Sequence, residues 1–288
     1  MSLLWLNGTL TDKADARVSP FDHGFLYGDG VWEPLRVFGG KLFRADDHLR
    51  ILFAAAQAVG IDISLSQAEL LAAIEATVKA NNRTEGYVRV IVTRGPGTLG
   101  PDPRKIEPQV IVIAEEYQPF PQELYGHGLH AAIVHLPINM NHPLHRARTL
   151  GRGYWVVTSK RVAHREGCLE AIMMTYCSGE NACGGCCTEG TLFVVSRDEI
   201  RWLMTDAPPE VAADVAAQVA KAAGYRVVWG AVDSRDILSA NELFIAGTAC
   251  GVIGIVRVDG RDIGTGTEGP VTRDIREAYQ RLTRGEST

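Results

Sequence analysis

The chain has 288 residues, of which 46% are hydrophobic and 22% charged, a composition typical of a globular protein with room for two modest domains. Its 29 basic and 34 acidic residues give a formal net charge of −5, which disfavours electrostatic binding of nucleic acid. Without an apolar run of transmembrane length or a secretory start, the six cysteines indicate reduced thiols, and we expect no membrane partner and a cytoplasmic location.

Strand-like and helix-like stretches alternate in the first part of the chain. Apolar and β-branched residues predict strands over 31–38, 86–93 and 109–114. Between the first two strands, helices are predicted over 48–59 and 67–80, each preceded by Asp or Ser residues that can cap it. This order predicts a small α/β domain at the N-terminus.

A Pro-containing stretch with little pattern divides the chain. We expect a small N-terminal α/β domain over 1–117, an interdomain linker over 118–126 and a large C-terminal α/β domain over 127–288. In the large domain, the predicted helices and strands occupy 147–165, 170–175, 191–195 and 209–223. The predicted fold class is α+β.

Four segments closely resemble class IV aminotransferases, a family that includes branched-chain aminotransferase, D-amino-acid aminotransferase and aminodeoxychorismate lyase. The first is SPFDHGFLYGDGVWEPLRVFGGKLFRADDHL at 19–49, and the others lie at 87–105, 170–174 and 241–273. The resemblance implies two α/β domains of the pyridoxal phosphate (PLP) fold type IV, with the active site in a cleft between them. It also implies a homodimer and a PLP cofactor bound to a lysine.

Several positions that hold PLP in the family carry other residues here. Arg148 stands at the position of the Schiff-base lysine, and arginine stays protonated, so it supplies no free amine. Ile51 stands at the position of the phosphate-binding arginine. Pro208, Pro209 and Glu210 occupy the phosphate-binding helix start, where prolines remove amide donors and Glu210 would repel a phosphate. We therefore expect no PLP, with PLP binding as the alternative.

The substrate pocket of the family is better kept. The matching positions are Tyr27, Trp32, Tyr87, Arg89, Thr248 and Ala249. Arg89 is suited to hold a carboxylate through two hydrogen bonds, and the turn at Thr248 to donate to anions. The alternative is that Trp32 and Tyr87 are packing residues of the inherited fold.

A cysteine-rich loop, CSGENACGGCC at 177–187, falls beside the PLP position implied by the resemblance. One hypothesis is a thiol nucleophile beside Arg148. Another is a metal site formed by Cys183, Cys186, His142 and His145, at zinc-like spacing, and a third is inert packing. The catalytic candidates are Arg148, Cys183, Cys186, Cys187 and Glu189, the last also a candidate for the cofactor-pairing carboxylate.

Three functions stay open from the sequence. The first is a PLP-independent enzyme acting on a small carboxylate-bearing substrate that resembles an amino or keto acid. The second is a conventional aminotransferase or aminodeoxychorismate-type lyase, for which Lys160 is the lysine candidate. The third is a non-catalytic ligand-binding homologue.

Overall fold

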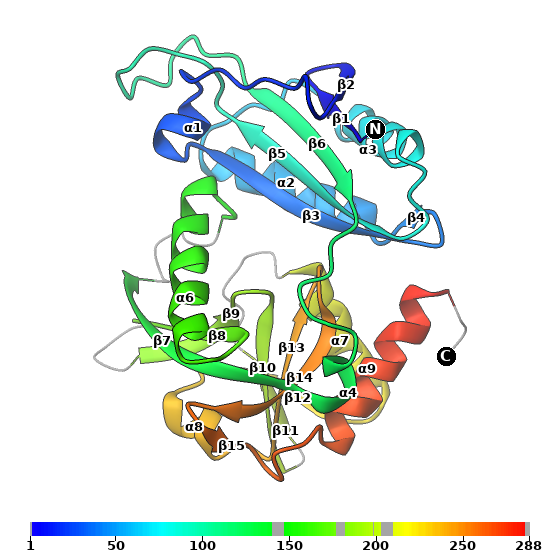
Figure 1. Ribbon diagram of the computed structural model, residues 1–288, viewed down its shortest axis with the longest axis vertical. Coiled ribbons are helices and arrows are strands. Elements are labelled where there is room, and N and C mark those ends of the chain that lie inside the picture. The colour runs from blue at the N-terminus through cyan, green and yellow to red at the C-terminus, as the bar shows by residue number, and fades with distance from the viewer. Residues whose placement is uncertain (1, 140–146, 177–181, 198, 203–209, 286–288) are drawn as a thin grey trace. The chain divides into compact units, whose positions relative to one another are not determined.

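The computed structural model describes residues 2–139, 147–176, 182–197, 199–202 and 210–285. The chain divides into two compact units. One comprises Met1–Tyr117 and Pro143–Gly153, and the other comprises Gln118–His142 and Tyr154–Thr288. Each unit has its own sheet (Figure 1). This mixture of helices and sheets confirms the predicted α+β class.

The first unit is an antiparallel sheet covered by helices. Its strands are β1 (Leu3–Leu6), β2 (Thr9–Asp12), β3 (Gly30–Phe38), β4 (Lys41–Leu42), β5 (Gly86–Thr93) and β6 (Gln109–Glu115), in the order β2-β1-β6-β5-β3-β4. Its helices are α1 (His23–Tyr27), α2 (Ala45–Ala58) and α3 (Gln67–Ala80), with the 3-10 helix η1 at Leu150–Arg152. The predicted strands and helices of this region are thus all present.

The two-residue period of the strands assigns the faces of this sheet. Leu35 on β3 pairs with Val88 on β5, and both are buried in the core with α2 and α3, which Figure 1 shows on one side of the sheet. Side chains alternate along a strand, so Trp32 on β3 and Arg89 on β5 lie on the opposite face. The sheet therefore separates its apolar core from a face that carries aromatic and charged groups.

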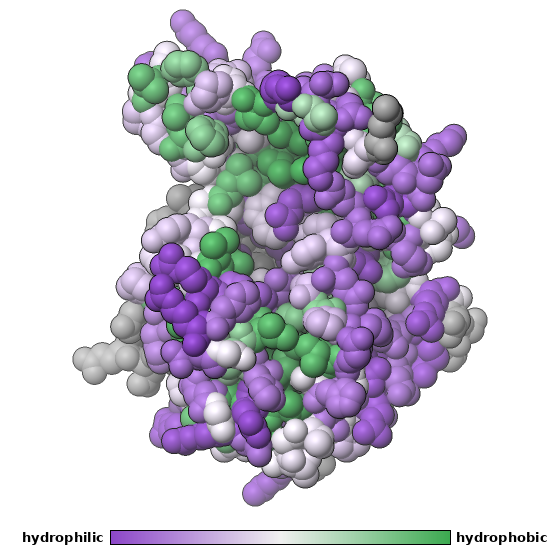
Figure 2. All heavy atoms as spheres, viewed as in Figure 1, coloured by the Kyte–Doolittle hydropathy of each residue, from purple (hydrophilic) through white to green (hydrophobic). Residues whose placement is uncertain are grey.

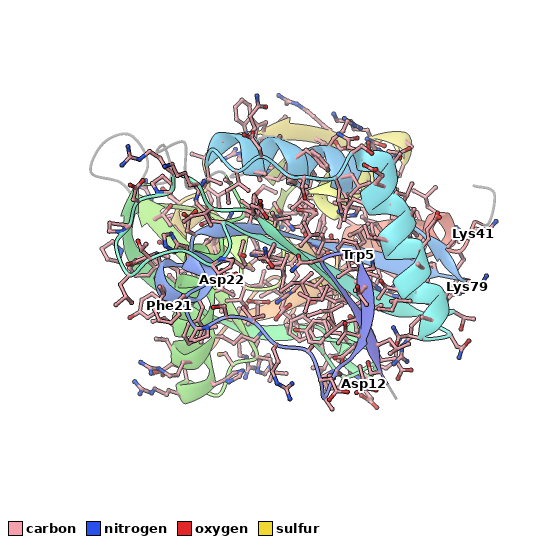
Figure 3. All side chains as sticks on the ribbon, turned by 90° about the horizontal axis from the view of Figure 1, so that it is seen from above. Trp5, Asp12, Phe21, Asp22, Lys41 and Lys79 are labelled. Atoms are coloured by element: carbon pink, nitrogen blue, oxygen red, sulfur yellow. The ribbon has the colours of Figure 1, made fainter. Side chains whose placement is uncertain are left out.

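Asp22 fixes the start of α1. Its carboxylate accepts hydrogen bonds from the backbone N–H of Gly24 at 2.7 Å and from the Thr93 hydroxyl at 2.8 Å. The first caps the helix and the second ties it to the end of β5. Figure 3 labels Asp22 beside Phe21, at the edge of the unit where this short helix begins.

The second unit contains a sheet whose strands close into a barrel. Its strands are β7 (Leu129–Asn139), β8 (Glu170–Tyr176), β9 (Ala182–Cys187), β10 (Thr191–Ser196), β11 (Glu199–Trp202), β12 (Arg226–Trp229), β13 (Glu242–Gly247), β14 (Gly251–Val258) and β15 (Arg261–Asp262). The sheet order is β12-β11-β10-β13-β14-β7-β8-β9, and β9 pairs again with β10. Six strands, from β10 through β13, β14, β7 and β8 to β9, therefore close on themselves as a barrel.

Apolar side chains of the barrel strands share one core. Ile172, Leu192, Ile245 and Ile253 are fully buried in it. Helices surround the strands: α4 (Leu124–His127), α6 (Gly153–Arg165), α7 (Val211–Ala222), α8 (Ser234–Leu238) and α9 (Pro270–Thr283). The opposite side of β8 packs against α6 through Ala171 and Ala163. The second unit is thus a helix-covered barrel.

The expected linker belongs to the second unit. Phe120 is 2% exposed and lies in the barrel core, and α4 begins within the stretch 118–126. The two prolines that suggested a linker border this buried aromatic side chain. The expected boundary at 126 is therefore corrected to the start of 118–126.

The segment before α6 also departs from expectation. Thr149 forms a β-bridge with Val31, and Trp32 donates its backbone N–H to the carbonyl of Arg148 at 3.0 Å. The helix expected from Ala147 begins only at Gly153, because the backbone of residues 148 and 149 is engaged by β3. This segment belongs to the first unit, not to the second domain as predicted.

Candidate functional site

In the first unit, two arginines lie on one tryptophan. The guanidinium carbon of Arg89 lies 4.4 Å from the ring centre of Trp32, and that of Arg148 lies 5.7 Å from it. Arg89 also donates to the hydroxyl of Tyr87 at 3.0 Å. Stacking on an aromatic face leaves the N–H edges of a guanidinium available to an anion. Three predicted substrate residues and Arg148 are thus brought together, and we call this group the Trp32 cluster.

Arg148 is held as a buried cation. Its Nη1 lies 3.6 Å from Glu33 Oε2, and Glu33 Oε1 lies 2.8 Å from His48 Nδ1. Glu33, His48 and Arg148 are all buried. A buried carboxylate requires such partners, because an isolated charge is costly away from water. Arg148 therefore serves at least to neutralise Glu33.

Tyr27 lies at the edge of the same unit. Its hydroxyl donates to the backbone carbonyl of Leu99, and its side chain is 47% exposed. The ring of His23 contacts it edge-on at 5.1 Å between centres. Tyr27 thus contacts α1 and the loop after β5.

In the second unit, two turns pack together. The Glu189 turn, residues 187–190, is closed by a hydrogen bond from Cys187 N to Gly190 O of 2.7 Å. The Thr248 turn, residues 247–250, joins β13 to β14, and the Cys250 thiol lies 3.5 Å from the carbonyl of Glu189. The predicted residues Glu189, Thr248 and Ala249 are therefore on two neighbouring turns.

Lys160 and Glu170 meet at the Glu189 turn. Lys160 on α6 donates to Thr188 Oγ1 at 3.3 Å and to Glu189 Oε1 at 3.4 Å. The Thr188 hydroxyl donates in turn to Glu170 Oε1, which also accepts from the N–H groups of Thr188 at 2.8 Å and Ala171 at 2.7 Å. A lysine amine is thereby connected through one hydroxyl to a fully buried carboxyl.

The pKa of Glu170 is raised. Burial is the main cause, because it penalises the charged form, and the charge of Glu189 adds to it. The charge of Lys160 and the hydrogen bonds from Thr188 and Ala171 oppose the shift. Glu170 Oε2 is buried and has no hydrogen-bond partner among the described residues. These features favour a protonated carboxyl.

The cysteines of β9 point in two directions. Cys187 is buried in the barrel core, whereas Cys186 packs against the side chains that face α6. Burial raises the pKa of Cys187 well above that of a free thiol, with the charge of Glu170 adding to the effect, and burial does the same for the pKa of Cys250. A thiol with a raised pKa is a poor nucleophile, so Cys187 is better suited to packing than to attack. Cys186 stays a predicted catalytic residue.

The Thr248 turn donates to a carboxylate of the chain itself. Glu210 Oε1 accepts the backbone N–H of Thr248 at 3.0 Å and its hydroxyl at 3.3 Å. Glu210 is the N-cap residue of α7, but its side chain makes no capping bond to that helix. The donors of the turn therefore bind a carboxylate of the chain itself, and the predicted binding of a substrate anion by this turn stays a prediction.

The proposed metal ligands fall largely outside the described residues. His142, His145 and the side chain of Cys183 belong to the undescribed part of the chain. Among the residues that the structure does describe, no group of three or more His, Cys, Asp or Glu side chains is placed to hold a metal ion. The zinc hypothesis therefore stays a prediction.

Sequence reasoning missed part of this arrangement. From the sequence, Glu170 is only the first residue of a matching segment, and Glu210 only a group that would repel phosphate. The Glu210 carboxylate instead accepts from a turn 38 residues away. No short-range pattern marks such a contact, although a Glu at a position where the resemblance implies an anion is a usable signal.

Comparison with known proteins now decides the family. A family model described as amino-transferase class IV matches residues 30–258, well over half of the chain. The chain belongs to the class IV aminotransferase family. A Methanocaldococcus jannaschii protein assigned as a branched-chain-amino-acid aminotransferase is 33% identical over 96% of this chain and 95% of its own length. D-alanine aminotransferase of Bacillus licheniformis is 30% identical, covering 95% and 94%.

Solved structures of branched-chain aminotransferases share the fold. The Escherichia coli enzyme gives a TM-score of 0.89 at 26% identity and covers 100% of this chain and 96% of its own. The enzyme of the archaeon Thermoproteus uzoniensis, crystallised with norvaline, also gives 0.89, at 24% identity, covering 99% and 96%. These matches confirm the fold expected from the sequence.

Two contacts of the described residues bear on whether a phosphate-bearing cofactor fits this family member. The donors of the Thr248 turn already bind the Glu210 carboxylate, which carries the same sign of charge as a phosphate. Arg148, the residue matched to the family lysine, is a guanidinium paired with Glu33. A guanidinium cannot supply the free amine that binds PLP, so within the described residues of the second unit Lys160 and Lys221 are the amines to consider.

No helix within the described ranges is long and apolar enough to cross a membrane. The cytoplasmic location expected from the sequence stays a prediction.

Proposed function

We propose that this class IV aminotransferase family member is an enzyme that binds a small amino or keto acid through its carboxylate and works without lysine-bound PLP. The supporting observation is the Trp32 cluster, in which the guanidinium groups of Arg89 and Arg148 both lie on Trp32. Arg148 is the residue that the sequence resemblance matches to the family lysine. Relatives named as branched-chain and D-alanine aminotransferases support a substrate with a carboxylate.

Arg89 is the residue we assign to the substrate carboxylate. Its guanidinium is stacked on Trp32 at 4.4 Å and steadied by Tyr87, which restricts its orientation before any ligand arrives. A planar guanidinium can donate two parallel hydrogen bonds to a carboxylate, which a lysine cannot. Arg148 adds a second positive charge on the same ring, while its contact with Glu33 keeps it in place.

An exposed apolar patch on the first unit supports a homodimer, which we include in the proposal. The patch consists of Phe21, Phe25, Tyr27 and Leu99, and Phe25 is 74% exposed. Hydrophobic atoms gather over α1 and the loop after β5 in Figure 2. The Tyr27 hydroxyl donates to the carbonyl of Leu99, and Gly97 N donates to Phe21 O at 3.0 Å, so α1 and the segment before it are tied to the loop after β5. Large exposed apolar patches are typical of protein contact sites.

A conventional PLP enzyme is the second candidate, favoured by one observation. Lys160 and Lys221 are the only lysines in the sequence of the second unit, and the Lys160 amine lies beside a carboxylate and a hydroxyl, at Glu189 and Thr188. A lysine amine is the group that binds PLP in aminotransferases. In this candidate Lys160 takes the role of the missing family lysine.

Visible absorption separates the two candidates. The purified protein is mixed with excess PLP, treated with borohydride and digested, and the peptides are analysed by mass spectrometry. The proposal expects no aldimine absorption band and no fixed cofactor. A band that borohydride bleaches, with the adduct on Lys160 and its loss in K160R, would establish the second candidate and overturn the first.

Carboxylate binding is tested with Arg89→Lys. Calorimetric titration with 4-methylvaleric acid and with pyruvate is expected to show a Kd about tenfold or more higher in the variant, since a hydrogen-bonded charge contact contributes about 1.5–3 kcal/mol. Arg104→Lys, which alters an exposed arginine paired with Asp102, is the matched control. An equal Kd in wild type and Arg89→Lys would remove Arg89 from the proposed site.

A further inference from the structure

The contact between Glu210 and the Thr248 turn has the geometry of an oxyanion site. Two donors of one residue, a backbone N–H at 3.0 Å and a hydroxyl at 3.3 Å, converge on a single carboxylate oxygen. Thr248 is buried, so few water molecules compete for these donors. Hydrogen bonds to an ionised acceptor are roughly twice as strong as neutral ones. The turn is therefore built to hold a negative oxygen.

We propose that Glu210 is an internal anion that fills an oxyanion-binding turn at Thr248. By occupying the donors of the turn, its carboxylate prevents inorganic phosphate and phosphate esters from binding there. The turn itself can accept any small oxyanion, because its donors recognise an oxygen and not the group that carries it. What excludes a free anion is that the chain supplies its own. This inference goes beyond the proposed function, since it concerns one turn and not the substrate or the reaction.

The position of Glu210 at the start of α7 supports this role. The first three residues of the helix, Val211, Ala212 and Ala213, are buried and carry no polar side chain. Helix starts favour a negative charge, because the peptide dipoles and unpaired N–H groups point toward it. The Glu210 carboxylate makes no capping hydrogen bond to α7, but it places a negative charge at this helix start while its oxygen accepts from Thr248.

The surrounding charges strengthen the exclusion. Burial is the main cause of the raised pKa of the nearby Cys250 thiol, and the charges of Glu189 and Glu210 add to it, so both carboxylates lie close enough to the turn to act on its thiol. Lys160 offsets one of them through its contact with Glu189 at 3.4 Å. A second anion at Thr248 would meet Glu210 at contact distance. Removal of the Glu210 carboxylate is therefore required before a free oxyanion can bind.

The test measures the melting temperature, Tm, of the full chain in inorganic phosphate and in sodium chloride of equal ionic strength. Glu210→Ser is the variant that removes the carboxylate from the Thr248 donors. Serine is a preferred N-cap residue, so α7 should stay stable. We expect phosphate to raise the Tm of Glu210→Ser by about 3 °C relative to chloride, as for a ligand present at several times its Kd. The wild type should show no difference between the two salts.

Two further variants separate occupancy from other effects. Glu210→Gln keeps a side-chain oxygen that can accept from Thr248, so it should not respond to phosphate. Glu210→Ser combined with Thr248→Val lacks the hydroxyl donor and should lose most of the response. The proposal is overturned by equal phosphate effects in wild type and Glu210→Ser, by a full response in Glu210→Gln, or by no response in Glu210→Ser.

A titration of Glu210→Ser with phosphate, monitored by phosphorus NMR at the same concentrations, tests binding even if the variant has low stability. Line broadening reports binding even where the melting transition is poorly defined. Absence of broadening in Glu210→Ser overturns the proposal. Because no PLP is present in these measurements, their outcome is independent of the absorption experiment described above.

Discussion

Glu170 shows how one buried residue makes stability depend on pH. It is fully buried, one of its oxygens has no hydrogen-bond partner within the described part of the chain, and its pKa is raised chiefly by burial. At a pH between the ordinary and the raised pKa, the folded chain therefore binds more of this proton than the unfolded chain does. The resulting stabilisation is complete below the ordinary carboxyl pKa and is lost as the pH rises toward the raised one.

We expect Glu170→Gln to remove this dependence. The difference in free energy of unfolding between Glu170→Gln and the wild type, measured with urea, should increase as the pH rises from the ordinary to the raised pKa. The increase is up to about 1.4 kcal/mol per pH unit. Glu69→Gln is the control with the opposite sign, since hydrogen bonds from Ser66 lower the pKa of Glu69. Parallel pH profiles for wild type and Glu170→Gln would contradict the assignment.

At the scale of elements, the end of β13 and the Glu189 turn approach so closely that a glycine is required. A Cβ atom added at Gly247 would lie 1.9 Å from the carbonyl oxygen of Glu189. This is a contact between two backbones, so it cannot be relieved by rotating a side chain. The two turns of the second unit can therefore approach this closely only because residue 247 has no side chain.

Gly247→Ala is therefore expected to destabilise the fold by about 3 kcal/mol or more, measured by urea unfolding. Gly126→Ala is the matched control. Gly126 is in α4, and an added Cβ there meets no described atom within 4 Å apart from its chain neighbours and the backbone of its own helix. Alanine at that helical position should be neutral or should stabilise by up to about 1 kcal/mol. Similar changes in the free energy of unfolding for both substitutions would contradict the prediction, because the two turns would then move apart at little cost.

At the scale of the whole molecule, the exposed patch of Phe21, Phe25, Tyr27 and Leu99 predicts self-association. Phe25→Asp should weaken the homodimer by at least about 30-fold in Kd, because burying one such side chain is worth about 2 kcal/mol and a buried charge adds a penalty. Light scattering across a dilution series measures this.

Trp229→Asp is the control for that experiment. Trp229 is 66% exposed and lies on β12 in the other unit, so its replacement should leave the Kd unchanged. A wild-type chain that stays monomeric at high concentration would contradict the proposed dimer.

Much of the fold could be read from local patterns. The helix at Gln67–Ala80 and the strand at Gly86–Thr93 agree with the predicted bounds, since a capping serine and alternating apolar residues act within one element. The helix predicted from Ala147 is wrong for its first residues. Residues 148 and 149 instead pair with a strand more than a hundred positions earlier in the chain. A local pattern does not register such a partner.

The sequence by itself determined the family and the order of elements, because these depend on matched motifs and short-range periodicity. It also predicted Trp32, Tyr87, Arg89 and Arg148 as site candidates. The tertiary structure alone decided what those residues contact. It paired Arg148 with Glu33, connected Lys160 to Glu170 through Thr188, and placed the Glu210 carboxylate on the donors of Thr248. Each of these contacts joins residues far apart in the chain, and electrostatic interactions depend on distance in space and on burial, neither of which a linear sequence contains.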